Sequence, residues 1–118
     1  MKTYLDVIEE TVAFYTEDVN RRSFDENNDM CMYNGPDGKQ CAFARCANEI
    51  DNYYEGQTAS SVISAKGFGI LKPEYRHLTN KLFWYDLQNF HDDKANFNDT
   101  GLTDDGELVV ENLINKYK

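Results

Sequence analysis

The stretch Cys31-Met-Tyr-Asn-Gly-Pro-Asp-Gly-Lys-Gln-Cys-Ala-Phe-Ala-Arg-Cys46 decides the predicted fold, because it holds all three cysteines and the strongest turn signal. Its centre, Asn34-Gly35-Pro36-Asp37-Gly38, combines residues that favour tight turns: glycine tolerates positive φ, proline fixes φ, and Asn and Asp bond their own backbone. Short apolar runs flank this centre at 30–33 and 41–43. The pattern predicts a β-hairpin with a five-residue loop at 34–38.

Helices are predicted on both sides of the hairpin. Over residues 4–19 an apolar stripe recurs every three or four positions, Thr3 can cap its start, and Arg21 and Arg22 lie beyond its end. Thr58 is placed to cap a short helix over 59–65, with Gly67 as its stop.

Two further helices are predicted in the second half of the chain. Pro73 favours a helix start, so we expect a long helix over 73–92, with Asp86 inside its apolar arc and in need of a partner. After a polar linker over 93–103, a helix over 105–117 has Asp104 as its expected cap. The fold class is therefore α+β: one domain, 1–118, in which a small antiparallel hairpin or sheet packs with three to four helices.

Composition restricts the classes of function. The formal net charge of −9 opposes binding to nucleic-acid backbones and favours basic partners. No run approaches the ~20 apolar residues of a membrane span, and the N-terminus lacks a signal-peptide core. The odd number of cysteines fits a reducing compartment, so we expect a cytoplasmic protein.

The three cysteines allow two kinds of chemistry beside a structural role. Cys31, Cys41 and Cys46 are weak zinc candidates, because their spacings of ten and five residues contain no close pair. Cys41 could act as a nucleophile with His91, oriented by Asp92, if the fold brought them together. The preferred interpretation is that the cysteines are packed in the core, and no cofactor is predicted.

Residues 96–107 partly match a calcium-binding loop between two helices. Asn96, Asn98, Thr100, Gly101 and Glu107 fall on positions 1, 3, 5, 6 and 12 of an EF-hand, although position 1 is normally Asp. A solvated linker is the preferred interpretation.

Two surfaces are candidates for binding. The 34–38 turn, helped by Lys39, could cradle an anion with its backbone N–H groups. His77, Trp84 and His91 share one stripe of the predicted long helix, either as an aromatic interaction face or as a face packed in the core. The full set of candidate binding residues is Tyr33, Asn34, Gly35, Asp37, Lys39, Tyr54, Glu55, His77, Trp84 and His91.

Four segments together resemble a small domain encoded by tailed bacteriophages and their bacterial hosts. They are Cys31-Met-Tyr33, Gly38-Lys-Gln-Cys41-Ala-Phe-Ala44, Tyr54-Glu-Gly56 and Leu87-Gln-Asn-Phe-His-Asp92, and they cover roughly 31–92. The chain departs from that domain after Cys41-Ala42, where the family usually has a small residue and then apolar ones. The resemblance implies a phage or prophage source and no particular activity.

The resulting hypothesis is a non-enzymatic phage-type protein that binds and modulates or inhibits a host protein, for example a defence factor. The alternative is a small-molecule or metal-binding domain, or an enzyme, that uses Cys31, Cys41, His91 and Glu55.

Overall fold

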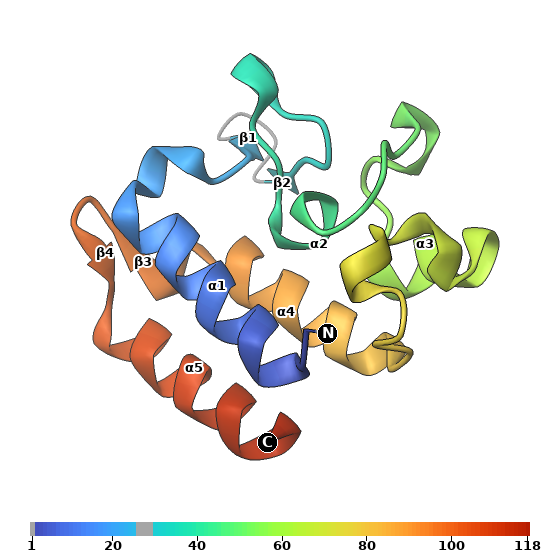
Figure 1. Ribbon diagram of the computed structural model, residues 1–118. Helices are drawn as coiled ribbons and strands as arrows, with labels where there is room; N and C mark the ends of the chain where they lie inside the picture. Colours follow the sequence, from blue (N-terminus) through green and yellow to red (C-terminus); the bar gives the residue numbers. More distant parts are fainter. Residues whose placement is uncertain (1, 26–29) are drawn as a thin grey trace.

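Helices form most of the structure (Figure 1). The computed structural model describes residues 2–25 and 30–118. Within these residues there are five α-helices: α1 Tyr4–Glu17, α2 Ala42–Arg45, α3 Ala59–Lys66, α4 Lys81–Asp92 and α5 Asp104–Tyr117. Two antiparallel strand pairs complete the fold: β1 Phe24–Asp25 with β2 Met30–Cys31, and β3 Phe97–Asn98 with β4 Gly101–Leu102. The predicted α+β class is confirmed.

Helix α4 lies at the centre of the packing. Helices α2 and α3 contact it, while α5 contacts both α4 and α1, so that α1, α4 and α5 lie side by side (Figure 1). The interior contains aromatic and branched side chains of α1, α2, α3 and α4, including Ile8, Tyr15, Phe43, Ile63, Phe83, Trp84, Leu87 and Phe90. None of the helices within the described ranges combines the length and apolarity needed to cross a bilayer.

The predicted starts of two helices are confirmed by their caps. At α1, Asp6 N donates to Thr3 Oγ1 at 3.1 Å and Thr3 N donates to the Asp6 carboxylate at 2.9 Å, a reciprocal capping box. At α3, Ser61 N donates to Thr58 Oγ1, and Gly67 ends the helix with φ 77°, a conformation that favours glycine.

The predicted hairpin over 30–43 is wrong in its pairing. Strand β2 pairs with β1, which precedes it, with Phe24 opposite Cys31. The 34–38 turn folds back on itself, because Gly35 N donates to Lys39 O at 2.8 Å. Residues after the turn form α2, whose Phe43 N donates to the Gln88 side chain of α4 at 2.9 Å. Packing against α4 therefore makes 42–45 a helix instead of a strand.

The predicted helix over 73–92 begins eight residues later than expected. Pro73 opens only a short 3₁₀ turn, Pro73–Tyr75. Helix α4 starts after Asn80, whose Oδ1 accepts hydrogen bonds from Leu82 N at 3.0 Å and Phe83 N at 3.4 Å. An amide cap of this kind sets the helix start more strongly than the proline does.

The stretch over 93–103 is a structured hairpin, not a plain linker. Strands β3 and β4 pair with Phe97 opposite Leu102. Helix α5 is capped by Thr103, whose Oγ1 accepts from Gly106 N at 3.1 Å, so the expected cap at Asp104 is wrong.

Candidate functional site

The pair considered as a nucleophile and its base, Cys41 and His91, lies in the interior. Cys41 and His91 have no exposed surface. His91 Nδ1 lies 3.0 Å from Asp92 Oδ1, and Gln88 Nε2 donates to that same oxygen at 2.5 Å. The side chains of Cys41 and Gln88 also interact, so Cys41, Gln88, His91 and Asp92 lie in one region.

The chemistry of this cluster argues against catalysis. Burial raises the pKa of the Cys41 thiol to about 12, so the nucleophilic thiolate is not available near neutral pH. Burial also lowers the pKa of His91 below its ordinary value, although its bond to Asp92 acts in the opposite direction. His91 Nε2 is buried and has no hydrogen-bond partner in the part of the chain that the structure describes. A base that substrate cannot reach cannot transfer its proton.

The residues proposed as metal ligands do not form a metal site in the described ranges. Cys46 is buried like Cys41, and burial raises its pKa to about 11. No group of three or more His, Cys, Asp or Glu side chains within 2–25 and 30–118 is placed to hold a metal ion. The side chain of Cys31 lies outside the described part of the chain.

The calcium-loop hypothesis is also wrong in geometry. Asn96 is 2% exposed, and its Nδ2 donates to Phe90 O at 3.0 Å. Asn98 Oδ1 accepts hydrogen bonds from both the amide and the hydroxyl of Thr100, at 2.9 Å each. The oxygens that would have to converge on an ion instead belong to a β-hairpin and its contacts with α4.

The His77–Trp84–His91 stripe is not a surface. His77 precedes α4 and is exposed, and its Nε2–H donates to the Lys2 carbonyl. Trp84 has no exposed surface, and its Nε1 donates to Leu78 O at 2.9 Å. The assignments of Trp84 and His91 as binding residues are therefore corrected. Both are core residues, because α4 is buried on the face that carries them as well as on its apolar arc.

Several other candidates do come together, at a corner formed by 33–35 and 50–57. The Glu55 carboxylate accepts from Tyr33 N at 2.6 Å and from Asn34 N at 3.3 Å. Asn34 Nδ2 donates to Ile50 O at 2.7 Å and Asn52 Oδ1 at 2.9 Å. Each of these polar groups is thus satisfied within the corner, which explains how it holds its shape.

The remaining candidates have separate roles. Tyr54 packs edge-on against Tyr53, with ring centroids 5.1 Å apart, beside that corner. Gly35 is required for close approach, since a Cβ there would collide with the Ser23 side chain. Asp37 has φ 59°, a left-handed conformation at the tip of the turn, and lies with Lys39 beside a small recess.

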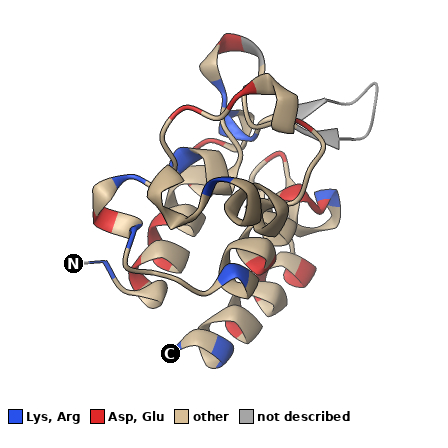
Figure 2. Cartoon of the chain, turned by 90° about the vertical axis from the view of Figure 1, so that its right-hand side faces the viewer, with Lys and Arg blue, Asp and Glu red and all other residues tan. Residues whose placement is uncertain are grey.

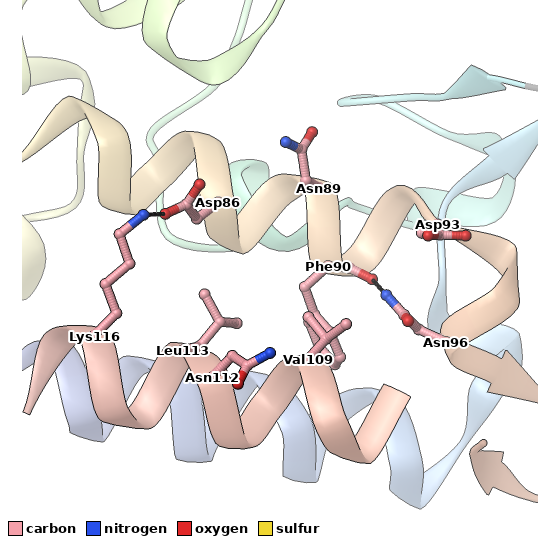
Figure 3. Close-up of a pocket in the computed structure, with 9 residues that line it drawn as sticks. All are labelled: Asp86, Asn89, Phe90, Asp93, Asn96, Val109, Asn112, Leu113 and Lys116. Atoms are coloured by element: carbon pink, nitrogen blue, oxygen red, sulfur yellow. Dashed lines mark hydrogen bonds and ion pairs between the residues drawn. The ribbon is translucent and has the colours of Figure 1, made fainter. Parts of the chain in front are cut away.

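A different feature is open to a ligand: a groove between α4 and α5 with a volume of about 320 Å³ (Figure 3). The two helices are antiparallel there, and Phe90, Val109 and Leu113 project between them. Phe90 and Leu113 are almost fully buried, so they form an apolar floor. We call this feature the α4/α5 groove. Its lining residues are Asp86, Asn89, Phe90, Asp93, Asn96, Val109, Asn112, Leu113 and Lys116.

The rims of the α4/α5 groove are polar. At one end, Lys116 Nζ donates to Asp86 Oδ2 at 2.8 Å, and Tyr117 OH donates to the same oxygen at 2.6 Å, which supplies the partner expected for Asp86 (Figure 3). Asn89 and Asn112 are exposed along the rims. An apolar floor with exposed amides at its borders can both bury a side chain and bond a backbone.

Sequence reasoning missed this groove because its two walls are about twenty residues apart in the chain. One signal was present in the sequence: Asp86 lies in an apolar arc and needs a partner. In the structure that partner is Lys116 of the last helix, and their ion pair bridges the two walls of the groove. The spacing of Asn89 and Asp93, matched by Asn112 and Lys116, places polar side chains one turn apart on each wall.

Comparison of the chain with protein-family models, with curated proteins and with solved structures gives no match.

Proposed function

We propose that this protein is a non-enzymatic binding protein, and that it takes a basic segment of a partner protein into the α4/α5 groove. The observation that carries the proposal is the apolar-floored groove, together with the exposed apolar side chains on the two helices that form its walls. Leu82 is 49% exposed on α4 and Leu108 is 57% exposed on α5. Exposed apolar groups beside a groove are typical of surfaces that bind another protein.

Charge supports a basic partner. Acidic positions recur along both helices (Figure 2), and α5 alone carries Asp104, Asp105, Glu107 and Glu111 in its exposed first turns. Among the described residues that line the groove, Asp86 and Asp93 are acidic and Lys116 is the one lysine. Together with the net charge of −9, this potential attracts a Lys- or Arg-rich segment and opposes an acidic one.

The form of the groove supports a helical segment. An amphipathic helix can lie along the space between two antiparallel helices, with its apolar side chains on the floor and its cations at the rims. The phage resemblance in the sequence supports a host protein as the partner, and the burial of Cys41 and His91 disfavours an enzyme.

The test is capture of partners from bacterial lysate by immobilised protein, quantified by mass spectrometry. Asn89→Arg with Asn112→Arg adds two positive charges at the groove rims. Gln57→Arg with Ala65→Arg adds the same charge at exposed positions outside the groove and serves as the matched control.

The proposal predicts a partner with a basic segment that the wild type and the control variant retain and the groove variant loses. Binding should also weaken as the salt concentration rises, because the Debye length, over which charges attract, shortens to about 8 Å at physiological ionic strength. Retention of the same partner by the groove variant would overturn the groove as the binding surface. Self-association of the chain in place of partner capture would overturn the proposal that the groove binds a basic segment of another protein.

A further inference from the structure

A second recess lies outside the α4/α5 groove and has the opposite charge. It has a volume of about 200 Å³ and is lined by Phe14, Arg21, Arg45 and the loop 37–40. Its side chains come from three segments: the end of α1 with the turn that follows, the loop, and α2. Arg21, Lys39 and Arg45 are cations, and Asp37 is the single acid among the described lining residues. Convergence of three cations is unusual in a chain of net charge −9.

The two arginines are held in place by the Phe14 ring. The guanidinium carbon of Arg21 lies 4.6 Å from the ring centroid, and that of Arg45 lies 5.6 Å from it. Arg21 Nη1 donates to Phe14 O at 3.1 Å, which ties the side chain to the end of α1. A planar guanidinium that is already oriented loses little entropy when it binds an oxyanion.

Donors remain unused at this recess. Arg45 Nη2 donates to Glu10 Oε1 at 2.9 Å and Thr11 Oγ1 at 3.1 Å, but the buried Arg45 Nε has no acceptor within residues 2–25 and 30–118. The Lys39 ammonium has no hydrogen-bond or ion-pair partner among the residues that the structure describes. Two carboxylates compete from the sides: Glu10 on Arg45, and Glu17, whose side chain is 72% exposed, on Arg21.

The loop that carries Lys39 is fixed at both ends of its turn. Gly35 N donates to Lys39 O at 2.8 Å, and Tyr15 OH donates to Gln40 O at 2.5 Å. The loop is thereby attached to α1, so that Lys39 is held near the two arginines before any ligand binds. Such preorganisation favours binding because less freedom is lost.

We propose that this recess binds the phosphate group of a small molecule. Its volume corresponds to about six or seven waters at ~30 Å³ each, which is enough for a tetrahedral oxyanion and part of the molecule that carries it. Two guanidinium groups and an ammonium suit a doubly charged ligand better than a single carboxylate, and arginine forks match phosphate oxygens in pairs.

The test follows backbone amide NMR signals of the full chain during titration with inorganic phosphate, at ionic strength held constant with sodium chloride. Saturable shifts are expected at Gly38, Lys39 and Gln40. Lys39→Ala should weaken binding about tenfold, since it removes one charged hydrogen bond. Lys118→Ala removes the same charge at the exposed end of α5 and should leave the affinity unchanged. Glu17→Gln should tighten binding, because it frees Arg21.

The opposite results would overturn the proposal. They are the absence of a saturable shift, or an affinity that Lys39→Ala and Glu17→Gln leave unchanged while the spectra of both variants show a folded chain. Acetate that binds as tightly as phosphate would overturn the assignment to a phosphate group. Parallel titration with a phosphate monoester separates the two sources: tighter binding than inorganic phosphate indicates a phosphorylated metabolite, and equal or weaker binding indicates the free ion.

Discussion

Replacement of Trp84 by alanine should remove several kcal/mol from the free energy of unfolding. Trp84 is the largest fully buried side chain among the described residues. Its ring packs against Phe83, Phe43 and Tyr75, with centroids 5.1, 6.0 and 6.3 Å away. Truncation of a buried Trp leaves a cavity and costs about 3–5 kcal/mol.

The hydrogen bond from the indole adds to this cost. Trp84 Nε1 donates to Leu78 O, and Leu78 lies in the segment that precedes α4. Loss of the donor leaves that carbonyl unpaired in the interior, at a further cost of about 1–3 kcal/mol. Because whole domains are stable by only about 5–15 kcal/mol, the variant should be close to unfolding at room temperature.

Urea denaturation followed by circular dichroism measures this loss. Leu82→Ala is the matched control on the same helix, since Leu82 is half exposed, and should cost below about 1 kcal/mol. Trp84→Phe keeps most of the ring and should cost about 1–3 kcal/mol through the lost donor, so it stays measurable if the alanine variant does not fold. A well-folded Trp84→Ala protein within about 1 kcal/mol of the wild type would refute this role in the core and return Trp84 to the surface candidates.

Three other results are expected. Stability should fall as pH drops below about 6.5, because His91 gains a proton there in the unfolded chain, whereas buried His91, with its lowered pKa, does not. Denaturation at pH 7 and at pH 5 should show this fall, and His91→Gln should make the stability less dependent on pH. The Cys41 thiol, buried and with its pKa raised to about 12, should react with a thiol reagent far more slowly in native than in denatured protein, and rapid native labelling would contradict its burial. Gly106→Ala should destabilise by about 1–3 kcal/mol despite the better helix propensity of alanine, because its Cβ would collide with Asn96 O, whereas Gly69→Ala, with open space around it, should be nearly neutral by thermal denaturation.

The helices with periodic apolar stripes and polar caps could be predicted from the sequence. Helices α1 and α3 begin at Thr3 and Thr58 as expected, because a cap and its helix are local in the chain. The two-residue strands could not, since alternation needs more residues to appear. Helix α2 has four residues and depends on its contact with Gln88, which is distant in sequence.

The candidate site was predicted less well for a related reason. Cys41 and His91 were considered as a nucleophile and its base, but burial decides whether such groups react, and burial depends on the whole packing. The α4/α5 groove needs two helices to form, and neither shows it alone. Pro73 and Asn80 compete as signals for the start of α4, and the Asn80 cap, together with the hydrogen bond from Trp84 Nε1 to Leu78 O, favours Asn80.

Site-specific cross-linking from the α4/α5 groove tests most directly whether it holds a basic partner segment. A photoreactive phenylalanine analogue in place of Asn112 lies on the groove rim, and the same analogue in place of Gln57 lies outside it. After irradiation in bacterial lysate, the Asn112 position should give a cross-link to a Lys- or Arg-rich segment of another protein, and the Gln57 position should not. Cross-links from Gln57 alone, cross-links between two copies of this chain, or no specific product from Asn112 would contradict the proposal.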